Sequence, residues 1–176
     1  LSENIHLDLD VNRIRIEVVT GKGSFSALRE LNYSPKLGSY YALIIAVEDY
    51  DDPAIQSLDE PVADAQKLSQ ILVNRYGFKS QNVTFLKNPA KAEIFDALQK
   101  KRTALTKDDN LLIFFAGHGH WDAEMNTGYW LPKDARQSNI ANWISNNDLT
   151  SYINVIKTKH TLLVADACFS GGIFKT

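Results

Sequence analysis

The stretch YALIIAV, residues 41–47, decides the fold of this chain. It is an unbroken apolar run of strand length, which is typical of a central strand covered on both faces. Three more runs of strand length, apolar except for Thr84 and Thr161, follow it at residues 83–86, 111–115 and 161–165, and stretches with helical spacing separate them. This alternation predicts an α/β fold with a mostly parallel central sheet and helices on both faces.

The intervening helices have recognisable start and stop signals. Pro61 suits the first turn of the first helix, and Gly77 ends it. For the second helix, Asn88 is the expected cap and Pro89 the expected start. Helical spacing of apolar residues over 149–156 predicts a third helix.

The first 39 residues show a different pattern. Apolar and polar residues alternate up to the turn signal Gly21-Lys22-Gly23, which predicts two short strands within residues 1–23. Residues 24–39 show no clear period, and 34–39 have the composition of a linker. We therefore expect residues 1–39 to be an N-terminal β extension, or the end of an upstream β domain plus a linker. Residues 40–176 then form the main domain.

Composition limits the classes of function that fit this chain. Of its 176 residues, 44% are hydrophobic and 23% are charged, as in an ordinary globular protein. The formal net charge of −2 gives no basic field to attract nucleic acid. No apolar run approaches the ~18 residues that span a membrane. We therefore expect neither nucleic acid nor a membrane as a partner, and we expect a cytoplasmic location.

The chain has a single cysteine, Cys168, so no internal disulfide can form. A lone cysteine is often a buried, unreactive thiol. With a suitable histidine elsewhere in the sequence, it is instead a candidate nucleophile in a reducing compartment. The residues around Cys168 distinguish these alternatives.

Two of the predicted strands end in unusual clusters. The run 111–115 leads into Ala116-Gly117-His118-Gly119-His120, and the run 161–165 leads into Asp166-Ala167-Cys168-Phe169-Ser170-Gly171-Gly172. Functional groups in α/β sheets gather beyond the carboxyl ends of the strands. Neighbouring parallel strands would therefore bring His118 and Cys168 together, although about 50 residues separate them in the sequence.

These residue types suit nucleophilic catalysis. A thiol with a pKa of ~8.5 is only a few per cent thiolate at neutral pH. An imidazole such as that of His118 could accept the thiol proton and later protonate a leaving amine. The backbone N–H of Gly119 could stabilise an oxyanion across the cleft. Taken alone, His118 could be an ordinary turn histidine, but two such clusters at corresponding strand ends argue against coincidence.

Together the two clusters resemble the catalytic dyad of the caspase and metacaspase superfamily, in which the His lies about 50 residues before the Cys. The segment around Cys168 is closer to the Asp-x-Cys-x-Ser-Gly form of metacaspases and their prokaryotic relatives, the orthocaspases, than to the animal caspase form. The resemblance covers about residues 40–172. It implies a caspase-like sandwich fold, with a large-subunit catalytic domain at 40–176. It also implies cysteine endopeptidase activity on protein or peptide substrates, through a thioester acyl-enzyme.

The resemblance also implies a substrate preference. Animal caspases hold an aspartate side chain with basic residues, whereas metacaspase-like enzymes hold Arg or Lys with acidic residues. Asp64, near the start of the first helix, and Asp166, just before Cys168, match those acidic positions. Two carboxylates in a narrow pocket would bind a cation through charge-assisted hydrogen bonds. The alternatives are a helix-dipole role for Asp64 and a strand-end turn role for Asp166.

This chemistry requires no cofactor. Gly-His-Gly-His, with His118 and His120, lacks the Cys or carboxylate ligands of a metal site. Asp49, Asp51 and Asp52 form an acidic loop after the first strand. Several metacaspases depend on calcium, so the resemblance leaves calcium open as an activator, although a solvated loop is the favoured interpretation.

We expect the caspase-like fold to be incomplete in this chain. A complete caspase fold needs further strands from a small subunit, and only residues 169–176 follow Cys168. Apart from Thr161, the run 161–165 is apolar, so it should be covered on both faces and paired on both edges. We therefore expect a small-subunit segment from the same precursor as a partner, with self-cleavage near Lys175 as its source.

Two other classes of protein fit the sequence less well. One is a caspase-like scaffold without activity, but the sequence keeps both dyad residues. The other is an α/β hydrolase with a serine nucleophile, but no Gly-x-Ser-x-Gly elbow occurs.

Overall fold

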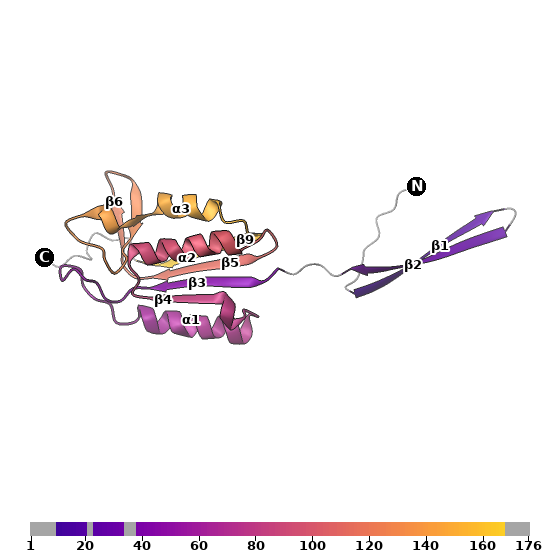
Figure 1. Ribbon diagram of the computed structural model, residues 1–176, viewed down its shortest axis with the longest axis horizontal. Helices are drawn as coiled ribbons and strands as arrows, with labels where there is room; N and C mark the ends of the chain where they lie inside the picture. The colour runs from indigo at the N-terminus through magenta and orange to yellow at the C-terminus, as the bar shows by residue number, and fades with distance from the viewer. Residues whose placement is uncertain (1–9, 21–22, 34–37, 168–176) are drawn as a thin grey trace. The chain divides into compact units, whose positions relative to one another are not determined.

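The computed structural model describes residues 10–20, 23–33 and 38–167, and the chain divides into two compact units, Leu1–Leu37 and Gly38–Thr176. The described part of the first unit is a hairpin. Its strands β1 (Asp10–Thr20) and β2 (Gly23–Tyr33) pair antiparallel in one continuous register (Figure 1).

This hairpin corrects the interpretation of the N-terminal sequence. Residues 24–33 show no clear period in the sequence, so no strand was predicted there, but they form β2, which pairs with β1 along its whole length. Alternation in this stretch is interrupted at Leu28-Arg29. Cross-strand pairing overrides such a weak local pattern. The apolar alternation expected to form a strand before residue 10 lies outside the described residues.

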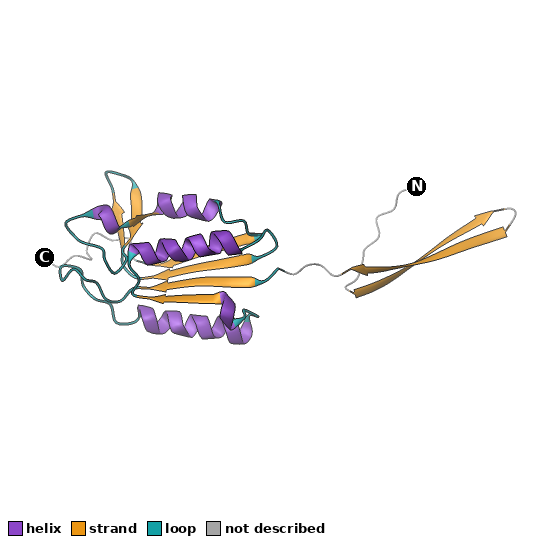
Figure 2. Ribbon diagram, in the orientation of Figure 1, coloured by secondary structure: helices purple, strands orange, loops and turns teal. Residues whose placement is uncertain are grey.

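The second unit has the α/β architecture that the sequence predicts. Its main sheet is parallel, with strand order β4-β3-β5-β9. The strands are β3 (Tyr40–Ala46), β4 (Val83–Lys87), β5 (Asn110–Ala116) and β9 (His160–Asp166). Helix α1 (Pro61–Arg75) lies on one face, and α2 (Lys91–Ala104) and α3 (Asn146–Asn154) lie on the other (Figures 1 and 2). Short 3-10 helices occupy Ser80–Asn82 and Ile140–Asn142.

Strand β3 is the centre of the core. Its side chains alternate between the two faces: Ala42, Ile44 and Ala46 pack with α1, whereas Leu43 and Ile45 pack with residues of α2 and α3. All five have no exposed surface. Burial of both faces explains why this stretch is apolar without a period of two.

The helix ends show one confirmed signal and one wrong prediction. Pro61 starts α1, and Gly77, with φ of +73°, follows its last turn as expected. Asn88 does not cap α2, which begins at Lys91 after Ala90. The Ala90 N–H instead donates to Glu93 Oε2 at 2.8 Å. Because proline disfavours a helical conformation in the preceding residue, the chain turns before the helix starts.

A small antiparallel sheet extends from the end of β5. It consists of β6 (Gly119–Asp122), β7 (Thr127–Trp130) and β8 (Ile144–Ser145). Trp130 is buried and stacks on Phe115 of β5, with ring centroids 4.3 Å apart. This stacking fixes the small sheet to the main one, directly beside the turn that carries His118.

Strand β9 differs from the other described strands of the main sheet. Within the described residues it pairs with β5 alone, and Leu162, Leu163 and Val164 are 61%, 41% and 38% exposed. No helix in the described part of the chain is long and apolar enough to cross a membrane.

Candidate active site

The turn after β5 places His118 at the carboxyl edge of the main sheet. Ala116, the last residue of β5, lies opposite Asp166, the last residue of β9. The Gly117 N–H donates to the Asp166 carbonyl at 3.3 Å, so the two strand ends remain joined past the regular ladder. The structure therefore brings the beginnings of both predicted clusters together.

Contacts of the His118 ring indicate which of its nitrogens carries the proton. Nε2 lies 2.8 Å from the Gln56 carbonyl oxygen. A carbonyl oxygen only accepts hydrogen bonds, so Nε2 carries a proton and Nδ1 of the neutral ring holds the lone pair. Desolvation lowers the pKa of the half-buried imidazole, and the hydrogen bond to Gln56 partly opposes this. Burial thus favours the neutral form, which can accept a proton.

Gly119 begins β6 and is buried. It lies opposite Trp130, and the Leu131 N–H donates to the His118 carbonyl at 3.0 Å. This hydrogen bond makes Gly119 and Trp130 a non-hydrogen-bonded pair of the antiparallel ladder. The Gly119 N–H therefore takes no part in the β6–β7 ladder, which is compatible with donation to a substrate oxygen.

One cavity brings three of the predicted site residues together. It has a volume of about 310 Å³, and its lining includes His118, Asp64 and Asp166. The rest of the lining comes from the start of α1 and the end of β5, namely Leu58, Glu60, Pro61, Ala116 and Gly117. Cys168, the predicted nucleophile, lies outside the described residues.

The cavity contains an acidic residue that was missed in the sequence. Glu60 lines it, one helical turn before Asp64. This spacing of four residues at the start of a helix, with both side chains on one face, is the signal that could have found it. Asp64 is itself paired, because Lys67 Nζ donates to its Oδ1 at 3.0 Å. That hydrogen bond and the charge of Asp64 raise the pKa of Lys67, with a smaller contribution from Glu60.

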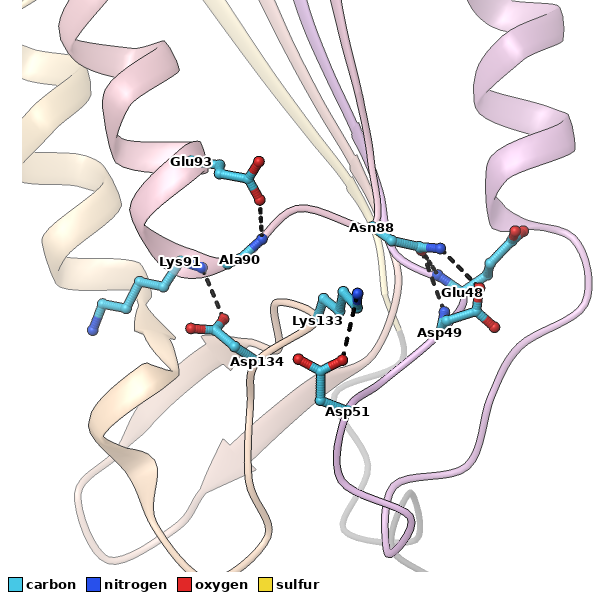
Figure 3. A network of polar contacts seen from close by, with 9 residues as sticks. All are labelled: Glu48, Asp49, Asp51, Asn88, Ala90, Lys91, Glu93, Lys133 and Asp134. Atoms are coloured by element: carbon cyan, nitrogen blue, oxygen red, sulfur yellow. Dashed lines mark hydrogen bonds and ion pairs between the residues drawn. The ribbon is translucent and has the colours of Figure 1, made fainter.

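The acidic loop after β3 has a structural role in the described part of the chain. Asp49 accepts from the Asn88 side chain at 2.9 Å, and Asp51 lies 3.5 Å from Lys133 Nζ (Figure 3). Asp52 accepts from two backbone N–H groups, those of Ala54 and Gln137.

The three carboxylates of this loop thus hold three different segments instead of converging. Among the described residues, no group of three His, Cys, Asp or Glu side chains could hold a metal ion. The acidic loop therefore does not fit a calcium site. His120 packs its ring against Trp143, with centroids 4.9 Å apart.

Comparison with known proteins gives the family. The caspase-domain family matches residues 39–176, so the chain belongs to that family. Metacaspase-1 of Eremothecium gossypii is 28% identical over 51% of this chain and 21% of its own length. Metacaspase-1 of Cryptococcus neoformans is 25% identical over 86% of this chain and 36% of its own length. The chain thus spans between about a fifth and a third of these relatives.

A solved structure supports the fold assignment. Caspase-1 from Spodoptera frugiperda superimposes with a TM-score of 0.60 at 24% identity, over 75% of this chain and 48% of its own. The predicted caspase-like α/β fold, with its mostly parallel sheet, is thereby confirmed. The relatives named here are fungal metacaspases, so the closer resemblance to prokaryotic orthocaspases stays a prediction.

Proposed function

We propose that this chain is the large catalytic part of a cysteine endopeptidase that cleaves after Arg or Lys, with Cys168 as nucleophile and His118 as general base. The observation that carries the proposal is the cavity in which the His118 imidazole and the carboxylates of Asp64 and Asp166 lie together. Membership of the caspase-domain family supports the reaction class.

The strand register supports the pairing of the two dyad residues. Ala116 and Asp166 are opposite each other in parallel strands. His118 and Cys168 each follow two residues later in the sequence. Side chains that follow paired ends of parallel strands gather at one edge of the sheet. This placement is what a thiol and its base require.

In the proposed reaction, His118 Nδ1 accepts the Cys168 thiol proton, and the thiolate sulfur attacks the carbonyl carbon of the scissile amide. The backbone N–H of Gly119 donates to the oxygen that becomes negative. Collapse of the tetrahedral intermediate breaks the C–N bond, and the imidazolium gives its proton to the leaving amine. Water, deprotonated by His118, then hydrolyses the thioester. This step releases a carboxylic acid and restores the thiol, and no cofactor takes part.

The charges in the cavity favour a basic side chain before the scissile bond. Asp64 and Asp166 supply two carboxylates, and Glu60 adds a third. Asp64 already binds one ammonium group, that of Lys67. A guanidinium or ammonium from a substrate would gain charge-assisted hydrogen bonds here, whereas an aspartate side chain would meet like charge.

We further propose that a small-subunit segment from the same precursor completes the sheet along β9. Three consecutive apolar residues of β9, Leu162, Leu163 and Val164, are exposed, and such an edge is normally covered. Self-cleavage near Lys175 would suit the proposed preference for basic residues. Mass spectrometry of the full precursor should then show a cut chain for the wild type and an uncut chain for Cys168→Ala, and cleavage of both would exclude self-cleavage.

The proposed activity is tested on a library of fluorogenic peptides, with calcium and with a chelator. We expect the wild-type protein to cleave after Arg and Lys, and Cys168→Ala and His118→Ala each to lose at least about 10³-fold in kcat/KM while remaining folded. Rapid alkylation of Cys168 by iodoacetamide near neutral pH would indicate an activated thiol. An unreactive thiol and no cleavage would instead indicate an inactive caspase-like scaffold, and preference for Asp would overturn the specificity.

A further inference from the structure

We propose that Tyr50 is a positioning residue that holds His118 in the orientation needed for proton transfer. The inference rests on the proposed role of His118 as general base. Tyr50 lies in the segment between β3 and α1, and it does not line the cavity that contains His118. Its effect on the reaction would therefore act through His118 and not through substrate contact.

Two contacts join Tyr50 to His118. The Tyr50 hydroxyl accepts a hydrogen bond from the His118 backbone N–H at 2.9 Å. The two rings also lie against each other, with centroids 5.2 Å apart and planes tilted by 33°. Burial raises the pKa of the Tyr50 phenol, although the hydrogen bond from His118 opposes this. The hydroxyl therefore stays neutral in the working pH range, and its oxygen accepts from His118.

The residue before His118 is packed closely against Tyr50. A Cβ atom at Gly117 would lie 3.3 Å from the Tyr50 hydroxyl oxygen, 3.2 Å from the Val47 carbonyl oxygen and 3.1 Å from Phe115 Cζ. These separations are shorter than ordinary carbon contacts. Glycine at this position therefore lets the turn approach Tyr50 closely enough for the hydrogen bond to form.

The same segment also holds the other end of His118. Gln56, six residues after Tyr50, supplies the carbonyl oxygen that contacts His118 Nε2 at 2.8 Å. The segment thus fixes both the backbone nitrogen and the ring of the histidine. With both fixed, the direction of Nδ1 is set before substrate binds, which is the condition for efficient proton transfer.

The segment can act as a support because it is anchored on both sides of Tyr50. The Asn88 side-chain oxygen accepts from the backbone N–H groups of Glu48 and Asp49, at 2.8 and 3.3 Å (Figure 3). The Asp51 N–H donates to the Lys133 carbonyl at 2.9 Å. These bonds attach the segment to residues that follow β4 and β7, so the backbone on both sides of Tyr50 is held in place.

The test compares Tyr50→Phe with Tyr129→Phe in the full-length protein. Tyr129 is a matched control because it is buried in the apolar cluster against which Tyr50 packs, and its hydroxyl donates to Met125 Sδ at 3.5 Å instead of to the turn that carries His118. We expect Tyr50→Phe to lower kcat about 10-fold with KM and Tm nearly unchanged, since it removes one hydrogen bond and keeps the ring. Tyr129→Phe should leave kcat unchanged. An unchanged kcat in Tyr50→Phe, or a loss that follows the unfolded fraction, overturns the proposal.

A second measurement does not depend on peptidase activity. NMR titration of His118 is done in a Cys168→Ala background, which removes the titration of the thiol. Glu60, Asp64 and Asp166 line the same cavity in both proteins, so their charges do not change. Burial holds the His118 pKa below its ordinary value. Adding Tyr50→Phe should loosen the turn, admit water and move that pKa upward; Tyr129→Phe should not.

The two measurements separate failure of this inference from failure of the proposed function. If wild-type protein has no peptidase activity but Tyr50→Phe moves the His118 pKa, the positioning role stands and the catalytic role of His118 fails. If cleavage is normal and neither kcat nor the pKa responds to Tyr50→Phe, only the positioning role fails.

Discussion

Strands β3 and β9 belong to the same parallel sheet and have nearly the same apolar character, yet their surroundings are opposite. Leu43, Ile44 and Ile45 of β3 have no exposed surface, whereas Leu162, Leu163 and Val164 of β9 are 61%, 41% and 38% exposed. The difference arises from neighbours. Strands β4 and β5 pair with both edges of β3, and helices cover both of its faces. An apolar run thus indicates that a strand needs to be buried, and the neighbouring strands and helices determine whether it is buried.

This comparison extends to the candidate site, because the two proposed catalytic residues, His118 and Cys168, follow strands with different surroundings. His118 follows β5, and it is held by the anchored segment that follows β3. Asp166 ends β9, and Cys168 follows it. The proposed base is therefore held by an anchored segment, whereas the proposed nucleophile follows a strand that, within the described residues, pairs with β5 alone.

The largest effect is expected from matched Leu→Ala substitutions in the two strands. Leu43→Ala should lower the free energy of unfolding by about 2–5 kcal/mol, because it leaves a cavity in a closed core. Leu163→Ala should cost only about 0.5–1 kcal/mol in this chain, because water already reaches the side chain. Denaturant titration of both variants measures the difference. In a chain that includes the proposed small-subunit segment, the cost of Leu163→Ala should rise toward that of Leu43→Ala. If Leu163→Ala costs as little there as it does in this chain, the proposal that another segment covers β9 is contradicted.

The next largest effect is expected at two acidic residues of the cavity. Asp166 ends β9, and Asp64 lies in α1, which covers one face of β3. We expect Asp166→Asn to raise KM for Arg peptides about 10-fold, with little change in kcat, because it removes a carboxylate from the cavity. Asp64→Asn should raise KM less, because Lys67 already shares its charge. Asp96→Asn, on the exposed face of α2, is the control and should leave KM unchanged. A larger effect at Asp64 than at Asp166 would reverse this order.

A smaller effect is expected in the pH dependence of kcat/KM. The base must be neutral, so activity should rise as pH rises through the His118 pKa. Burial lowers that pKa below 6.5, so the acid midpoint should lie below 6.5 as well. The carboxylates of Glu60, Asp64 and Asp166 face the same cavity and would favour the charged form, but desolvation is the largest influence. Kinetics between pH 4.5 and about 8.5, spanning about two units on either side of the reference value, provide the measurement.

Much of the fold could be predicted because continuous apolar runs carry a strong signal. The bounds of β3, β4, β5 and β9 agree with the predicted strands within one residue at each end. Strand β2 was missed because its alternation is interrupted at Leu28-Arg29, and its pairing with β1 is not a local property. The start of α2 was misplaced because an Asn-Pro pair fits a turn as well as a cap.

Residues of the candidate site could be predicted only where a characteristic side chain lies in a recognisable motif. His118, Asp64 and Asp166 were named from motifs, and the structure places all three around one cavity. Gln56 could not be found, because it acts through a backbone carbonyl, which every residue has. Tyr50 was missed for a related reason: its position against His118 depends on how the segment after β3 folds back. Whether Cys168 meets His118 stays a prediction.

The smallest effect is expected at Lys67, and it tests whether the carboxylate of Asp64 binds a basic side chain of the substrate. Lys67 Nζ lies 3.0 Å from Asp64 Oδ1, and both side chains are exposed, at 67% and 60%. A substrate cation must compete with this ammonium for the same carboxylate, so Lys67→Met should lower KM for Arg peptides. Exposed ion pairs are weak, so the decrease should be only about two- to threefold.

Lys107→Met, another exposed lysine, controls for the change in net charge. High salt should reduce the difference between Lys67→Met and wild type, because screening weakens the pair. If Lys67→Met raises KM instead, Lys67 contributes to substrate binding, and Asp166 with Glu60 must then supply the selectivity.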